Sequence, residues 1–238
     1  MLPDRSPVEY VVPVTGRDIR VLIPCAGEGE RWGNHLGVPK HLAPLAGEPI
    51  LHRTVRLLNE LVPGAEVLVV VADNRHQGYR VAGSVRRRAR LGTMEGDIDK
   101  IASSLHLWDD RRRTVLLFGD VWWTRDGLSA ALTHRGEWTA FGYFEPDNTG
   151  GELFGFSFPP GSLGTVRDAL HTVGAARLVD QRGGWMLYRQ LCGVDLTAQG
   201  NHGNWIVVDD WTEDMDFPSD WYAWSRRWAD AAPEARPL

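Results

Sequence analysis

The sequence predicts an α/β fold with three layers, α/β/α, built around a mostly parallel central sheet. Residues 21–25, 67–71 and 114–118 are continuous apolar runs, which indicates strands that are buried on both faces. Segments with helical periodicity separate these runs, so strands and helices alternate along the chain. Such alternation is typical of a parallel sheet that helices cover on both sides.

The first helix is expected at residues 49–60, directly before the second apolar run. Leu51, Val55 and Leu58 recur there at the spacing of one helical face, and Pro63 follows the last expected turn. This pattern predicts a helix that packs one apolar side against the sheet.

The remaining elements follow from the same patterns, although the section after residue 133 is less regular. Apolar runs and alternation indicate strands, and a spacing of three or four residues indicates helices. After the second run, helices are expected at residues 97–107, 126–133, 166–173, 184–191 and 218–228, and strands at 139–144, 152–158 and within 201–208. These elements predict a single domain over residues 19–228, with an N-terminal extension at 1–18 and a flexible tail at 229–238.

Composition argues against several classes of protein. A formal charge of −5 and a pI near 5.9 are unlike those of a general nucleic-acid binder. No apolar stretch approaches the roughly 18 residues of a membrane span. The spacing of Cys25 and Cys192 suggests neither a disulfide framework nor a zinc site. We therefore expect a soluble, cytoplasmic protein with no nucleic-acid or membrane partner.

An arginine-rich run at residues 86–90 goes against the acidic balance of the chain. It is interpreted as the solvated face of a helix, with contact to an anionic partner as the second interpretation.

A glycine-rich loop with nearby cations follows the first strand. Gly27, Glu28 and Gly29 are followed by Arg31 and, nine residues later, by Lys40. Glycines lack Cβ atoms and let backbone N–H groups approach a polyphosphate, which cations then neutralise. The segment is therefore predicted to bind a nucleoside triphosphate.

Acidic residues in two later segments are candidate metal ligands. Asp120 follows the third strand after a glycine, where a carboxylate is well placed to hold Mg²⁺ against phosphate oxygens. Six acids lie between residues 209 and 220, and a divalent cation would relieve their mutual repulsion. Asp216 is the preferred ligand, Asp214 is the alternative, and Asp220 is interpreted as a capping acid of the last helix.

A dinucleotide site is an alternative, because Gly27, Gly29 and Gly33 also follow a strand. That motif requires an acid at the end of the second strand, about 20 residues further on. The first candidate, Asp73, lies more than twice that distance away. An NAD(P)-dependent Rossmann oxidoreductase would also give Arg31 no role, so this interpretation is less favoured.

Several segments occur in a characteristic order over residues 20–225. They are Ile23-Pro24-Cys25-Ala26-Gly27-Glu28-Gly29-Glu30-Arg31 with Pro39-Lys40, then residues 42–51 (LAPLAGEPIL), Leu117-Phe118-Gly119-Asp120-Val121 and Asp214-Met215-Asp216-Phe217-Pro218-Ser219-Asp220. Together they resemble the nucleotidyltransferase family that makes nucleotide-diphospho-sugars and related activated alcohols, including the cytidylyltransferases. The resemblance implies a Rossmann-like nucleotide-diphospho-sugar transferase fold. It also implies Mg²⁺-dependent transfer of NMP from an NTP to a phosphorylated acceptor, first of all a sugar phosphate, with release of pyrophosphate.

The resemblance further implies a role for each matching residue. The nucleotide would be lined by Ala26, Gly27, Glu28 and Gly29, and Gly96 would lie close to the base. Arg31 would contact the β- and γ-phosphates, and Lys40 would contact the α-phosphate and the incoming phosphate. Mg²⁺ would be held by Asp120 and Asp216.

The chain also departs from the family pattern. Glu30 replaces the usual small hydroxyl residue, and Cys25 stands where alanine is usual. Neither the base-reading glutamine nor the sugar-phosphate segment E-K-P has a clear counterpart. The NTP and the acceptor therefore stay open, with a polyol phosphate or a cofactor precursor as further acceptors. A nucleotide-binding module without turnover is an alternative, and a homodimer is compatible with the sequence.

Overall fold

The computed structural model describes residues 16–27, 29–72, 81–89, 96–145, 150–176, 183–231 and 236–237. Its main sheet consists of β1 (Ile19–Pro24), β4 (Glu66–Val71), β5 (Val85–Arg88), β6 (Arg113–Leu117), β8 (Thr139–Phe144), β9 (Gly151–Phe158) and β10 (Trp205–Val207). The strand order is β10-β8-β9-β6-β1-β4-β5. Only β9 runs antiparallel to its neighbours, so the expected mostly parallel sheet is confirmed.

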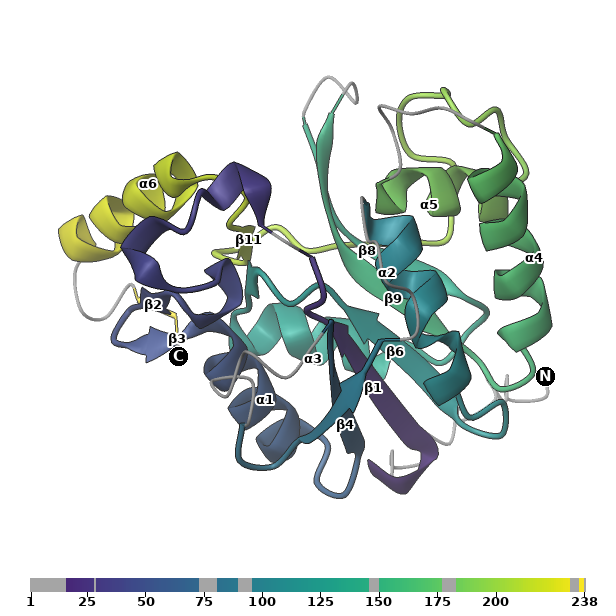
Figure 1. The fold of residues 1–238 in the computed structure, drawn as a ribbon, viewed down its shortest axis with the longest axis horizontal. Helices are drawn as coiled ribbons and strands as arrows, with labels where there is room; N and C mark the ends of the chain where they lie inside the picture. The colour runs from purple at the N-terminus through teal and green to yellow at the C-terminus, as the bar shows by residue number, and fades with distance from the viewer. Residues whose placement is uncertain are drawn as a thin grey trace, which may run out of the picture.

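Helices cover both faces of this sheet, as Figure 1 shows. The helices α1 (Ile50–Leu61) and α3 (Arg125–Thr133) pack against one face, and α2 (Asp97–Ser104), α4 (Leu163–Ala175) and α5 (Gly184–Cys192) pack against the other. Within β1, Val21 and Ile23 contribute to the first core, and Leu22 contributes to the second. This alternation follows from the two-residue period of a strand, and it places Val21, Leu22 and Ile23 in cores on the two faces of the sheet.

A smaller third core lies beside the sheet and is rich in tryptophan. It joins the hairpin β2 (Pro44–Leu45) and β3 (Glu48–Pro49), the pair β7 (Val121–Trp122) and β11 (Glu213–Asp214), and the last helix α6 (Pro218–Asp230). Trp122 packs against Trp224 of α6 with ring centroids 4.4 Å apart. The first turns of the chain after β1 lie next to α6 in Figure 1. This core therefore brings the N-terminal and C-terminal segments together.

The interpretation of the arginine-rich run as a helix face was wrong. Residues 85–88 form the edge strand β5, which pairs in parallel with β4. Since β4 is otherwise open on that side, the strand satisfies its backbone groups, and charged side chains at an edge discourage pairing with another chain. Arg90 lies outside the described residues.

No helix in the described part of the chain is both long enough and apolar enough to cross a membrane.

Candidate active site

The candidate site lies where β1 and β6 end, at the same edge of the sheet. These two strands are parallel neighbours, so the segments that follow them emerge side by side. Ala26 and Gly27 follow β1, and Asp120 follows β6. The backbone of Asp120 also accepts a hydrogen bond from Met215 N at 3.2 Å, which attaches the C-terminal segment to this edge. The topology therefore assembles three distant segments at one place.

Lys40 is the charged centre of the site. Its ammonium forms an ion pair with Asp120 and lies 2.8 Å from Asp216 Oδ1. Asp216 also pairs with the guanidinium of Arg31, a side chain that is 60% exposed. The structure thus brings together the two cations and the two acids that the sequence analysis selected.

The ion pairs keep Lys40 and Asp120 charged despite their burial. Burial alone would lower the pKa of Lys40, but Asp120, Asp214 and Asp216 outweigh it and hold that pKa well above its ordinary value. Burial alone would raise the pKa of Asp120, but Lys40, His41 and Lys100 outweigh it and hold that pKa far below its usual range. Asp120 therefore remains a carboxylate at every physiological pH.

Asp214 joins Asp120 and Asp216 in a cluster of three carboxylates. One oxygen of each lies within 4.8 Å of the others. Burial, and then the charges of Asp120 and Asp216, raise the pKa of Asp214 well above its ordinary value. Its Oδ1 atom is buried without a hydrogen-bond partner among the described residues. Three convergent carboxylates with an unsatisfied oxygen fit a hard divalent cation such as Mg²⁺. Asp216, the preferred ligand of the sequence analysis, and Asp214, its alternative, both belong to this cluster.

Lys100 is a site residue that the sequence analysis missed. A Cβ atom on Gly27 would lie 2.7 Å from Lys100 Cε, so the glycine leaves room for this side chain. Lys100 Nζ pairs with Asp97 at 2.9 Å, and Asp97 and Asp120 raise its pKa against the effect of burial. A signal was present in the composition, because the chain contains only two lysines, Lys40 and Lys100.

The remaining loop candidates are placed as follows. Gly29 has φ +69°, a left-handed conformation that favours glycine, and it begins the turn that carries Arg31. Gly96 has extended backbone and directly precedes α2, the helix of Lys100. Glu30 is exposed. Glu28 and Asp73 lie outside the described residues.

The acids around residue 216 divide into structural and site residues. Phe217 N donates a hydrogen bond to Asp220 Oδ2 at 2.6 Å at the start of α6, so the interpretation of Asp220 as a capping acid is confirmed. Asp210 accepts a hydrogen bond from Thr212 N at 2.6 Å and another from the hydroxyl of Thr124, so it is structural as well. Asp214 and Asp216 are left facing Asp120.

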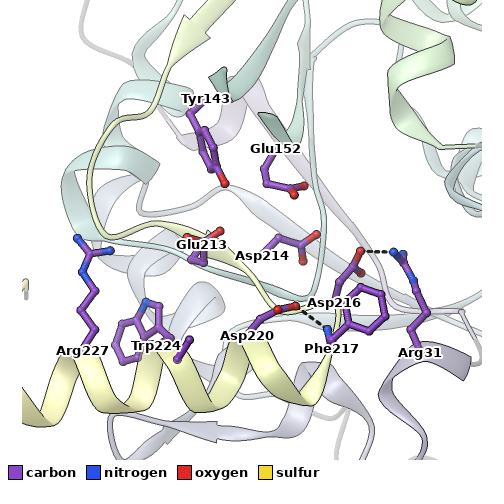
Figure 2. A pocket seen from close by; sticks show the side chains of 11 residues that line it. Arg31, Tyr143, Glu152, Glu213, Asp214, Asp216, Phe217, Asp220, Trp224 and Arg227 are labelled. Carbon is purple, nitrogen blue, oxygen red and sulfur yellow. Dashed lines mark hydrogen bonds and ion pairs between the residues drawn. The ribbon is translucent and has the colours of Figure 1, made fainter. Parts of the chain in front are cut away.

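A cavity of about 600 Å³ opens beside the carboxylate cluster (Figure 2). Its walls come from the ends of β8 and β9, from β11 and the following turn, and from α6. The lining residues are Arg31, Tyr143, Glu152, Glu213, Asp214, Asp216, Phe217, Asp220, Ala223, Trp224 and Arg227. Burial, followed by the charges of Asp216, Glu213 and Asp220, raises the pKa of Glu152 to about 7. The volume is in the range of cavities that hold small organic ligands.

Comparison with known families gives one match over most of the chain. Residues 21–186 match the model described as the MobA-like NTP transferase domain. The matched segment contains the glycine-rich loop, both lysines and Asp120, and it ends before Asp214 and Asp216.

Curated relatives share part of the chain. The bifunctional protein GlmU of Paraburkholderia phytofirmans is 31% identical over 170 residues, which are 69% of this chain and 34% of GlmU. The 2-C-methyl-D-erythritol 4-phosphate cytidylyltransferase of Symbiobacterium thermophilum is 42% identical over 126 residues, 49% of this chain and 51% of the relative. The chain therefore spans about a third to a half of these relatives.

Solved structures share the fold. A 4-diphosphocytidyl-2C-methyl-D-erythritol synthase from Anaerococcus prevotii superposes with a TM-score of 0.60 at 9% identity, covering 90% of this chain and 97% of that one. A putative glucose-1-phosphate thymidylyltransferase from Bacillus anthracis superposes with a TM-score of 0.57 at 11% identity, covering 90% and 96%. The expected fold of nucleotide-diphospho-sugar transferases is thereby confirmed.

Proposed function

Because this chain belongs to the MobA-like NTP transferase domain family, we propose that it transfers NMP from an NTP to a small phosphorylated acceptor. The observation that carries this proposal is the contact of Lys40 with both Asp120 and Asp216, at the sheet edge where the glycine-rich loop ends. A sugar phosphate is the first acceptor class to test, since the structural neighbours include a putative glucose-1-phosphate thymidylyltransferase.

The reaction joins two anions, so its main requirement is positive charge in a fixed position. An oxygen of the acceptor phosphate attacks the α-phosphorus of the NTP, the bond to the α–β bridging oxygen breaks, and pyrophosphate leaves. No protein nucleophile is needed, and positioning and electrostatic stabilisation supply the rate.

The two lysines and Arg31 would provide that charge. Lys40, held between Asp120 and Asp216, would draw the acceptor phosphate toward the α-phosphate. Lys100 lies against Gly27 and would contact the triphosphate from the loop side. Arg31 is exposed at the cavity and would neutralise charge on the departing pyrophosphate.

Mg²⁺ is proposed as the metal, held by Asp120, Asp216 and Asp214. When bound, it would supply Lewis-acid polarisation of phosphate oxygens and neutralise the charge of the leaving group. The three carboxylates would otherwise repel one another, which supports a role for them in holding a cation.

Pyrophosphate release tests this function. The purified protein would be incubated with Mg²⁺, each of ATP, CTP, GTP, UTP and dTTP, and a panel of sugar 1-phosphates and polyol phosphates. We expect acceptor-dependent release that Asp120→Ala lowers on the order of 10²-fold or more. Glu137→Gln, a change at an exposed acid outside the cavity lining, is the control. Release that needs no acceptor, or that survives Asp120→Ala, would contradict the proposal.

A further inference from the structure

The cavity beside the carboxylate cluster has an unusual lining for a pocket that receives a phosphorylated compound. Five carboxylates and two guanidinium groups line it. Among the described residues of the lining, only Arg31 brings positive charge into contact with the carboxylate cluster, at the end of the cavity next to Lys40. The rest of the lining is mainly acidic, although the charge of Arg227 acts on Glu213, and it therefore disfavours a compound that carries only a phosphate.

Most of these acids have a partner or a role. Asp216 pairs with Lys40 and Arg31, Asp214 belongs to the metal cluster, and Asp220 caps α6. These three acids would be present whatever the acceptor is. They do not explain the acidic wall farther from Lys40.

Glu152 is the acid that lacks a partner. It lies on β9, half-buried, and its carboxylate forms no hydrogen bond or ion pair with any residue that the structure describes. Figure 2 shows it pointing into the same space as Glu213 and the hydroxyl of Tyr143. Arg227, the second cation of the lining, stacks 4.0 Å above the ring of Trp211 instead of pairing with Glu152. An ionised carboxylate without a partner among other carboxylates is unfavourable, and a ligand that supplies a cation would relieve this cost.

Aromatic rings complete this part of the cavity. Tyr143 and Trp224 line it together with the acids, whereas the ring of Phe217 lies at the Arg31 end, 5.4 Å from that guanidinium (Figure 2). A ring face attracts an ammonium group, and a cation enclosed by rings and carboxylates is bound more tightly than by either alone. A neutral sugar can donate hydroxyl hydrogen bonds to the same carboxylates, but it does not neutralise their charge.

We propose that the acceptor is a phosphorylated amine, with its phosphate at Lys40 and its ammonium group at Glu152, Glu213 and Tyr143. The proposal rests on the proposed transferase function and specifies its acceptor. Two sources share this chemistry, namely amino-sugar phosphates and phosphorylated amino alcohols. In both, the negative and positive ends match the two ends of the cavity.

Matched pairs of acceptors test the proposal. Phosphoethanolamine is compared with 2-hydroxyethyl phosphate, and glucosamine 1-phosphate with glucose 1-phosphate, so that only the amine differs within a pair. Pyrophosphate release is measured with Mg²⁺ and each NTP. In parallel, calorimetry measures binding of each acceptor to the full chain without NTP, which reports on the cavity whether or not turnover occurs. Glu152→Gln removes the unpaired charge, and Glu137→Gln is the matched control.

We expect kcat/KM or affinity to be at least ten times higher for the amine in at least one pair. The ratio between amine and neutral partner is expected to fall toward one in Glu152→Gln and to remain unchanged in Glu137→Gln. Turnover with equal or better use of the neutral partners would overturn the inference and leave the transferase function standing. Preferential binding of an amine without turnover would support the ammonium site at Glu152 and contradict the transferase function. The absence of both binding and turnover with both amines would overturn the inference.

Discussion

The ammonium of Lys40 lies 2.8 Å from Oδ1 of Asp216, although 176 residues separate the two in the sequence. The same ammonium pairs with Asp120, which follows a central strand of the sheet. One buried cation thus joins the segment after β1, the end of β6 and the C-terminal segment. Lys40 and a divalent cation would share the carboxylates of Asp120 and Asp216, which makes the site sensitive to the removal of either.

Replacing Lys40 is the first prediction. Lys40→Met should lower turnover on the order of 10²-fold or more, because a preorganised charge is lost. Without metal it should also destabilise the fold by about 3–5 kcal/mol, since Asp120 remains buried and unpaired. Thermal unfolding with and without Mg²⁺ checks this, and Mg²⁺ should stabilise the variant more than the wild type. Arg87→Met, at an exposed position of β5, is the control. Equal stabilisation by Mg²⁺ in both proteins would show that Lys40 and the metal do not share ligands.

The second prediction concerns Asp214. Its neighbours Asp120 and Asp216 disfavour its ionised form, and its Oδ1 atom has no hydrogen-bond partner in the described structure. Asp214→Asn should therefore stabilise the metal-free protein. It should also weaken Mg²⁺ binding on the order of 10-fold or more, as loss of a direct ligand costs at least as much as loss of an outer-shell partner. Calorimetric titration with Mg²⁺ measures the second effect. Unchanged Mg²⁺ affinity would exclude Asp214 from the metal site.

Lys100 and Gly27 give the third prediction. Lys100→Ala should weaken NTP binding roughly 10-fold, the effect of losing one hydrogen bond to a charged group. Gly27→Ala should do the same with little loss of stability, because the new Cβ would meet the flexible end of Lys100. Gly164→Ala is the matched control, because a Cβ added at this position of α4 would meet no described atom within 4 Å. Fluorescence titration with an NTP analogue measures the affinity of both variants. Wild-type affinity in Gly27→Ala would show that Lys100 does not contact the triphosphate.

Glu152 gives a pH dependence without metal or substrate. Its pKa of about 7 in the folded protein lies above the ordinary value of 4.5, so the folded state holds an extra proton between these pH values. Stability contributed by this group should therefore fall as pH rises from about 4.5 to about 7 and remain low above that.

Glu152→Gln should remove that loss. At pH 8 the variant should be more stable than the wild type by on the order of 1 to 3 kcal/mol, and at pH 4.5 the difference should vanish. Denaturant unfolding in EDTA at the two pH values measures this difference. A gain of the same size at both pH values would mean that Glu152 does not titrate in this range.

The sequence predicts the main sheet well because its strands are solid apolar runs. Residues 67–71 and 114–118 have no alternative to burial on both faces, and β4 and β6 occupy them within one residue at either end. β5 was missed because its three arginines resemble a solvated surface, and only the open edge of β4 makes them a strand. Likewise the two-residue strands β7 and β11 carry no periodic signal and form through tertiary packing.

The candidate site could be predicted where a motif carries the chemistry and could not where tertiary structure does. Arg31, Lys40, Asp120 and Asp216 stand in ordered motifs, and the structure places them in contact. Lys100 lies in a helix whose periodicity hides it, and its role depends on the approach of that helix to Gly27. Glu152 has no hydrogen-bond or ion-pair partner among the described residues because of the way β9, β11 and α6 pack together. No local sequence pattern predicts that packing.

The most direct test of the transferase function is to follow the α-phosphorus of the NTP. The protein would be incubated with Mg²⁺, an NTP labelled at the α-phosphate, and the acceptor that supports pyrophosphate release. The proposed reaction predicts label in a pyrophosphate-linked product that contains the acceptor, in equal amount to the pyrophosphate released, and no label transfer by Asp120→Ala. Label recovered as free NMP, with the acceptor unmodified, would contradict nucleotidyl transfer and indicate hydrolysis.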